Sequence, residues 1–193
     1  MVRGGEGLKG KRQSTPAIET EALPVESLNA EALTSFFRSG YGNAYLGDES
    51  LHQKIGRSSC VVLLKDLERR DRLTAVALVA KHRILAMATS RDEVYRETRY
   101  DNAVRLLKDC TDKFGCEWLT IGQDYTRVQR AASDAGLERA NDGLLVDRLL
   151  TEEGERENYN LRYTDTGELL VTRFTSRFRP DYEQQLWVHF PEE

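Results

Sequence analysis

Several side chains that could perform chemistry are concentrated between residues 92 and 104. Asp92 and Glu93 are neighbouring carboxylates, which could act as a base directly or through water, or could form the charged end of a strand. Arg99 could contact a phosphate or stand in solvent at the start of a helix. Asn102 could present its backbone amide to an anion or cap that helix. The segment therefore combines candidates for proton transfer with candidates for anion binding.

A helix is expected directly after these residues. Ala103, Leu106, Leu107 and Cys110 follow one another at the spacing i, i+3, i+4 and i+7, which places them on one helical face. The start of a helix presents unpaired N–H groups and a partial positive charge, and both favour a bound pyrophosphate. The helix that begins near Asn102 is thus a predicted anion site.

Short apolar runs ahead of this region predict a sheet. They are expected to be consecutive antiparallel strands, because their connections are too short for crossovers, and they cover residues 60–64, 73–80 and 84–89. The second and third runs are rich in alanine, so a helix is the competing interpretation there. Two helices are expected before the strands, one from a cap at Asn29 or Ser27 to Gly40, and one over residues 49–55 stopped by Gly56.

The second half of the chain repeats the alternation of strands and helices. We expect a strand over 118–122, a helix over 128–135 with Gly136 as its left-handed cap, a strand over 144–150, a hairpin turning at residues 165–167, and a last strand over 185–190. This order predicts an α/β (α+β) fold with a mixed, mostly antiparallel sheet flanked by helices.

Length and composition fit one domain with a tail. The chain has 193 residues, of which 39% are hydrophobic and 31% charged, so an ordinary apolar core suffices. We expect a flexible tail over 1–20, the main domain over 21–150, and C-terminal strands over 151–193 that complete or extend the sheet. No apolar run is long enough to span a membrane and no secretion signal precedes the domain, so a cytoplasmic location is expected.

Other chemistries have little support in the sequence. The histidines are scattered at positions 52, 82 and 189, and the cysteines at 60, 110 and 116 lack metal-binding spacing, so the latter are interpreted as small buried hydrophobes. Motifs of serine hydrolases, P-loop NTPases and zincin proteases are absent. The formal net charge of −4 disfavours wholesale nucleic-acid coating.

One basic stripe leaves room for a local anionic partner. If residues 171–179 form a strand, Arg173, Arg177 and Arg179 share one face and Phe174 and Phe178 the other. The stripe is either a surface strand with an apolar underside or a site for a phosphate-bearing partner such as a nucleic acid.

The element order, together with the segment from Val94 to Leu107, resembles the GNAT (Gcn5-related N-acetyltransferase) superfamily. In that family an apolar strand residue is followed five positions later by Arg or Gln, then by a glycine-containing loop that leads into a helix. Val94 and Arg99 match the first part, and residues 99–104 stand where the loop belongs. The later stretch from Gly115 to Leu137 also resembles the family. The resemblance covers roughly residues 25–150.

The resemblance implies an acyl-coenzyme A donor, such as acetyl-CoA, bound near a splayed strand at Val94. The implied cofactor-binding residues are Val94, Arg99, Tyr100, Asp101, Asn102, Ala103 and Val104. Both loop glycines are replaced here, by Asn102 and Val104, and a β-branched side chain would project toward the phosphate. Asp101 adds a negative charge near that anion.

The residues expected to move protons also depart from the family. The position of the usual tyrosine acid is Ala132, and that of the usual asparagine is Tyr125. Tyr125 could replace the acid or could pack on the sheet edge, and Asp92 or Glu93 could serve as base. Residues 41–45 lie where the family often walls its acceptor pocket.

Two functional hypotheses follow. The first is an acyl-CoA-dependent N-acyltransferase that transfers an acetyl group directly to an amine of a small molecule or a protein, through a tetrahedral intermediate. The second is a GNAT-like domain without catalysis, which binds a protein or a nucleic acid, the latter through Arg173, Arg177 and Arg179. The sequence does not set the oligomeric state, and a dimer is compatible with it.

Overall fold

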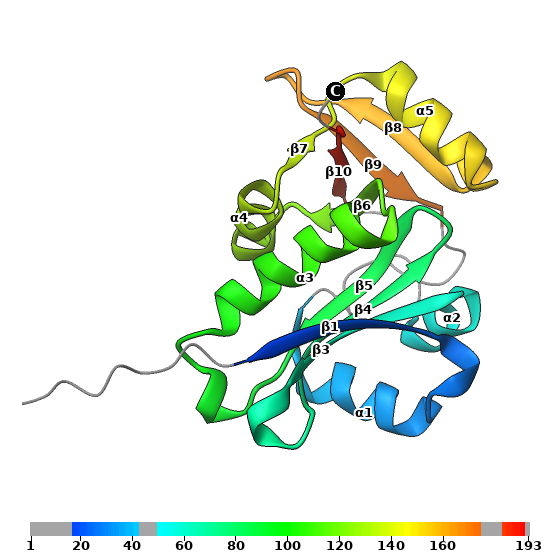
Figure 1. Cartoon of the computed structure of the whole chain (residues 1–193). Helices are drawn as coiled ribbons and strands as arrows, with labels where there is room; N and C mark the ends of the chain where they lie inside the picture. Colours follow the sequence, from blue (N-terminus) through cyan, green and yellow to red (C-terminus); the bar gives the residue numbers. More distant parts are fainter. Residues whose placement is uncertain (1–16, 43–49, 175–182, 192–193) are drawn as a thin grey trace, which may run out of the picture.

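The computed structural model describes residues 17–42, 50–174 and 183–191, whose elements form one sheet with helices on both faces (Figure 1). The first half contains β1 (Ile18–Pro24), α1 (Ala30–Ser39), β2 (Tyr41–Gly42), α2 (Leu51–Arg57), β3 (Cys60–Asp66), β4 (Arg72–Ala80) and β5 (Arg83–Thr89). The second half contains α3 (Arg99–Phe114), β6 (Trp118–Gly122), α4 (Thr126–Asp134), β7 (Leu137–Arg139), α5 (Gly143–Glu152), β8 (Tyr159–Tyr163), β9 (Leu169–Arg173) and β10 (Gln184–His189).

The sheet is mixed and mostly antiparallel, as predicted. Its strand order is β1-β3-β4-β5-β6-β10-β9-β8, with β2 added beside β5 and β7 beside β10. Among the described strands, the β5–β6 pair is parallel and all other pairs are antiparallel. The last strands β8, β9 and β10 extend the sheet beyond β6.

Helices cover the two faces of the sheet unequally. α3 and α4 pack on one face over a core that includes Leu106, Leu107 and Leu119. α1 packs on the opposite face through Leu33 and Phe37, and α2 joins it there through partly buried residues. α5 also lies on this second face. Its residues pack with Trp118, and the side chain of Trp118 points away from the α3 face because the next residue on β6, Leu119, points toward it.

The helix starts follow local capping chemistry. The side chain of Asn29 accepts hydrogen bonds from the amides of Glu31 and Ala32, which confirms the cap predicted for α1. Ser50 and Gln53 form a capping box at α2, whose last turn includes Gly56 rather than stopping before it. Gly115 and Gly136 both have positive φ after α3 and α4, as expected for left-handed caps.

Three cysteines lie in or against the core beneath α3, in agreement with their interpretation as small apolar residues. Cys110 and Cys116 are fully buried and Cys60 is partly buried against the same core. The neighbouring Cys116 thiol and burial raise the pKa of Cys110 well above its ordinary value, so its nucleophilic thiolate is disfavoured.

Two predicted elements differ from the structure. Residues 144–150 were expected to form a strand, but they belong to α5, whose first turn is capped by Asp142. The apolar residues Leu145, Val146, Leu149 and Leu150 recur at helical spacing and cover β8–β10. In addition, the described part of the chain contains the strand β1 ahead of the first predicted helix.

The predicted tail over residues 1–20 falls mostly outside the described residues, since these start at position 17, and Ile18–Thr20 are part of β1. Within the described ranges, no helix is long and apolar enough to cross a lipid bilayer.

The core packing of α3 gives a stability prediction. Replacing fully buried Leu106 by Ala removes apolar contacts and leaves a cavity, which should lower the free energy of unfolding by about 2–5 kcal/mol. Leu144→Ala is the matched control, because Leu144 is 83% exposed on α5 and its truncation should change stability by less than about 0.5 kcal/mol. Urea unfolding measures both, and equal losses in the two variants would contradict the packing of α3.

Candidate functional site at the divergence of two parallel strands

β5 and β6 run parallel but remain paired over only two residue pairs. Arg83 pairs with Trp118 and Ile84 with Leu119, after which the strands no longer share hydrogen bonds. The divergence coincides with a β-bulge at Leu85, where β5 carries one residue more than β4. A bulge bends its strand and increases its twist, so it accounts for the separation. The resulting opening faces the carboxyl ends of both strands.

The far end of β5 is occupied by the short strand β2. Tyr41 pairs with Thr89 and Gly42 with Ala88, while Leu85 and Ala86 have no strand partner on this edge within the described residues. Gly40 permits this close approach, because a Cβ there would lie 3.0 Å from both the Ala88 Cβ and the Thr89 carbonyl oxygen. Of the predicted substrate loop 41–45, residues 43–45 lie outside the described residues.

A loop from Ser90 to Thr98 connects β5 to α3 and is pinned at both ends. The Ser90 amide donates to the Thr74 carbonyl at 2.8 Å, and Arg72 pairs with Asp92 at 2.6 Å. Arg99, at the first position of α3, turns back and donates to the carbonyl oxygens of Ser90 at 2.8 Å and Asp92 at 3.4 Å. The start of α3 is therefore held in a fixed position relative to β5.

A buried tyrosine anchors the middle of the loop. Tyr95 is 3% exposed and donates its hydroxyl to the carboxylate of Asp66 at the end of β3, at 3.0 Å. Burial and the hydrogen bond to Asp66 raise the pKa of Tyr95 to about 12. Val94, by contrast, lies in a 3-10 turn and is 43% exposed. It is not a residue of the splayed strand, because β5 ends at Thr89 and the divergence begins after Ile84.

The first turn of α3 offers hydrogen-bond donors. The Asn102 amide bonds to the Thr98 carbonyl at 2.9 Å, so the amides of Tyr100 and Asp101 come before the helical ladder and have no acceptor within it. Thr98, at the N-cap, makes no side-chain hydrogen bond to these amides. Residues 99–104 thus begin a helix, as the sequence predicts, rather than lying in its middle.

Asn102 has an unsatisfied polar side chain in this first turn. The residue is 5% exposed, and its buried Nδ2 has no hydrogen-bond partner among the described residues. A buried donor without an acceptor costs about 1–3 kcal/mol. Such an orphan in a native structure calls for an explanation, and an absent acceptor ligand is one. The amide neither caps the helix nor packs as an inert core group.

Ala103 and Val104 pack against the core beneath α3. Val104 is half-buried against that core, so its side chain makes contacts within the protein. Tyr100 bridges to α4 by donating its hydroxyl to Asp134 at 2.6 Å, beneath the guanidinium of Arg130. Burial and the Asp134 carboxylate raise the pKa of Tyr100. The exposed carboxylate of Asp101 remains the feature least favourable to an anion.

The predicted acid and bases occupy different surroundings. The carboxylate of Asp92 accepts from the Val94 amide and pairs with Arg72, and exposed Glu93 pairs with Arg96 at 3.0 Å. Tyr125 follows β6 and begins α4, half-buried against the same core as α3. Its hydroxyl has no hydrogen bond within the described part of the chain. Of these candidates, Tyr125 therefore has its polar group unengaged.

A network that the sequence did not predict lies on the face opposite α3. Arg83 is 3% exposed and donates through Nη2 to the hydroxyls of Thr120 at 3.2 Å and Tyr159 at 3.0 Å. Its guanidinium lies 4.5 Å from the centroid of the Trp118 ring. The sequence did not indicate that Arg83 is buried, because a basic residue directly before an apolar run is usually exposed. The network joins β5, β6 and β8 at the first of the two paired positions of β5 and β6, next to the divergence.

Of the three arginines in the predicted stripe, Arg173 lies within the described residues. Arg173 pairs with Glu155 at 3.3 Å and lies over the Tyr159 ring, with 16% of its side chain exposed. It therefore faces this inner network rather than an open surface. Arg177 and Arg179 lie outside the described residues.

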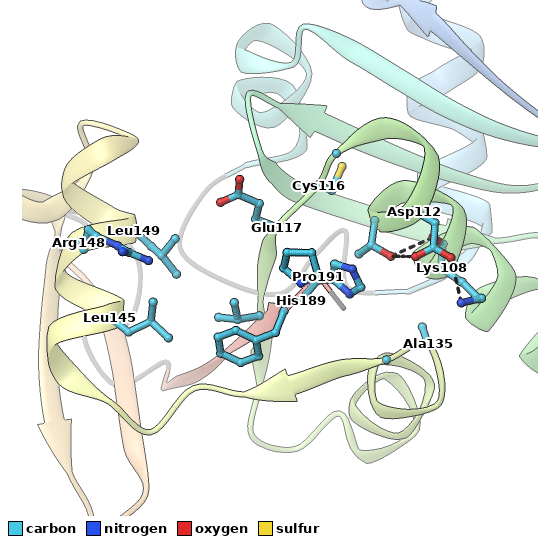
Figure 2. A pocket seen from close by; sticks show the side chains of 15 residues that line it. Lys108, Asp112, Cys116, Glu117, Ala135, Leu145, Arg148, Leu149, His189 and Pro191 are labelled. Atoms are coloured by element: carbon cyan, nitrogen blue, oxygen red, sulfur yellow. Dashed lines mark hydrogen bonds and ion pairs between the residues drawn. The ribbon is translucent and has the colours of Figure 1, made fainter. Parts of the chain in front are cut away.

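A separate cavity of about 800 Å³ lies between the end of α3, α5 and the end of β10 (Figure 2). His189 and Asp112 line it, and none of its lining residues is a predicted site residue. α3 has 16 residues and is therefore about 24 Å long, so the cavity lies far from the helix start. Within the described part of the chain, no cluster of three His, Cys, Asp or Glu side chains could hold a metal ion.

The chain resembles known proteins in its three-dimensional structure and not in its sequence. No protein-family model matches the sequence, and no curated protein sequence matches it. Among solved structures, an IAA acetyltransferase from Bacillus cereus is similar at 11% identity and a TM-score of 0.46, covering 90% of this chain and 99% of that one. The spermidine N-acetyltransferase of Vibrio cholerae, in a mutant form, is similar at 7% identity and a TM-score of 0.45, covering 89% and 93%. Likenesses at this level carry no statement about chemistry.

The anchor at Tyr95 predicts a pH dependence of stability. Because its folded-state pKa of about 12 exceeds the ordinary value of 10, the protonated hydroxyl stabilises the fold below about pH 10, and this contribution is lost between about pH 10 and 12. A shift of two units corresponds to about 3 kcal/mol. Urea unfolding across this range should show a smaller loss of stability for Tyr95→Phe than for the native chain. Parallel losses in the two proteins would contradict the buried hydrogen bond.

Proposed function

We propose that this chain is an acyl-CoA-dependent N-acyltransferase that transfers an acetyl group to an amine. The observation that carries the proposal is the start of α3, held beside two diverging parallel strands, with a buried side-chain amide that has no partner among the described residues. Diverging strands leave backbone groups open to an extended ligand, and a helix start favours its phosphate end. Both features meet at the carboxyl end of β5.

The same side-chain amide supports the fit of the residues present to coenzyme A. The unpartnered Nδ2 of Asn102 is a donor suited to a phosphate or carbonyl oxygen, beside the amides of Tyr100 and Asp101. Leu85 and Ala86 offer backbone groups to the amide-containing arm of the cofactor. When bound, coenzyme A supplies an acyl thioester, an electrophile that an unprotonated amine attacks directly. The contacts of half-buried Val104 with the core weaken the steric objection raised by its sequence.

The chain's own part in the reaction is to position the reactants and to manage one proton. We assign the acid to Tyr125, which follows β6, packs against the core beneath α3, and has no hydroxyl hydrogen bond within the described residues. Asp92 and Glu93 receive structural roles in this proposal, because each carboxylate already pairs with an arginine. A site furnished in this way works mainly by proximity.

Binding of acetyl-CoA is the first test. Isothermal titration should give a measurable dissociation constant, and at 100 times that concentration the cofactor should stabilise the fold by about 2.7 kcal/mol. Asn102→Asp places a second carboxylate at the helix start and should weaken binding at least about tenfold. Asn160→Asp on the exposed edge of β8 adds the same charge and should leave binding unchanged. An absence of heat and of thermal shift in the native chain would favour a binding module without catalysis.

The assignment of Tyr125 makes a separate prediction. Tyr125→Phe removes the hydroxyl and keeps the packing, so acetyl-CoA should still bind while the rate of acyl transfer falls by about 10²–10⁴-fold. Tyr163→Phe is the control, because Tyr163 is 56% exposed on β8 and its hydroxyl contacts Gly143 and Asn141 near the start of α5 rather than the start of α3, so this variant should retain the native rate. Steady-state thiol release measures both. A native rate in Tyr125→Phe would remove this residue from the chemistry.

A further inference from the structure

Gln184, the first residue of β10, is a second buried amide without a partner. It is 3% exposed, and its buried Oε1 accepts no hydrogen bond from the described residues. An unsatisfied buried acceptor destabilises the fold, and an apolar side chain of similar shape would avoid that cost. Gln185, the next residue, has no buried unsatisfied side-chain atom. Of these two neighbouring amides, Gln184 therefore carries the cost, while the ring nitrogens Trp187 Nε1 and His189 Nδ1 farther along β10 are also buried without a partner among the described residues.

The register of the sheet places Gln184 beside the divergence. It lies directly across from Gly122, the last residue of β6, and on its other side from Val171 of β9. Gly122 carries no side chain, so no β6 side chain separates Gln184 from the opening at this level. Two residues along β10, Leu186 packs with Trp118 on the face opposite α3, and the strand period of two gives Gln184 the same face.

The surroundings on this face are fixed by packing. On the β5 side of the opening, Ala86 and Ala88 are fully buried and belong to the core beneath α1, together with Leu33 and Phe37. On β6, the neighbouring polar group is Thr120, which accepts from Arg83 at 3.2 Å. On this face the divergence is thus bordered by the core beneath α1 on one side and by a fixed polar group on the other.

We infer that the Oε1 of Gln184 accepts a hydrogen bond from the amine acceptor and so sets its position, on the sheet face opposite α3. This inference rests on the proposed function. The two unsatisfied amides are complementary: Asn102 on the α3 face presents a donor, which suits the oxygen-rich cofactor, and Gln184 on the other face presents an acceptor, which suits N–H groups. The ligand class is a primary amine, whose N–H groups suit an acceptor that the described residues leave unsatisfied.

Gln184 acts in this scheme as a binding group. During transfer the amine nitrogen forms a bond to the acyl carbon, the carbon–sulfur bond breaks, and the proton lost by the nitrogen ends on the released thiol. The carboxamide neither gains nor loses a proton. Its loss should therefore raise the KM for the amine more than it lowers kcat.

The test uses acetyl-CoA with n-butylamine as the probe, and measures thiol release and thermal stability. Gln184→Met should raise the KM for butylamine about tenfold, equivalent to about 1.4 kcal/mol, while the affinity for acetyl-CoA stays within about twofold. Its melting temperature should rise by about 2–4 °C, because the orphaned acceptor is gone. Gln184→Glu keeps an acceptor oxygen and should not raise the KM. Gln185→Met is the matched control and should leave the KM unchanged.

The outcomes separate this inference from the proposal on which it rests. A native chain that fails to bind acetyl-CoA overturns both. A chain that binds acetyl-CoA but does not acylate butylamine, or a Gln184→Met variant with an unchanged KM, overturns only the inference. A lower melting temperature in Gln184→Met would give the amide a structural role, and would contradict the inference in the same way.

Discussion

The short parallel contact between β5 and β6 determines the geometry of the rest of the molecule. Only two residue pairs join these strands, and the bulge at Leu85 bends β5 away immediately afterwards. Arg83 stabilises this junction on one face by its hydrogen bonds to Thr120 and Tyr159. With longer pairing the sheet would be closed at this point, and α3 would begin over a continuous surface instead of an opening.

The opening is useful because fixed polar groups border it. The loop before α3 is tied to β3 and β4 through Tyr95 and Asp92, so the helix start cannot drift from β5. Donors that are already fixed in place bind a ligand at a lower entropic cost, because they do not have to be ordered during binding. Asn102 and Gln184 are the buried amides with an unsatisfied polar atom among the described residues. In the proposal, Asn102 marks the cofactor side of the opening and Gln184 the acceptor side.

Much of the fold could be predicted from the sequence, because hydrophobic periodicity and caps report local structure directly. β3, β4 and β5 were recognised as apolar runs, and α1 by the cap at Asn29. The failure at residues 144–150 has a physical reason, since a short leucine-rich run suits a buried strand as well as one side of a helix. β1 was missed because it is an edge strand whose residues alternate with Glu and Thr and include few bulky apolar groups.

The site was less predictable than the fold. The helix start at residues 99–104 followed from spacing, but the burial of Asn102 and the inward packing of Val104 depend on how α3 lies on the sheet. Arg83 and Gln184 carry no local signal, since their importance arises from partners, or the lack of one, distant in the sequence.

Hydrogen–deuterium exchange with and without acetyl-CoA tests the central claim most directly, because it reports where the cofactor binds rather than whether it does. The account predicts slower exchange at the amides of Leu85, Ala86, Tyr100 and Asp101, with no change around His189. Protection confined to the cavity at the end of α3, with none at the start of that helix, would contradict it.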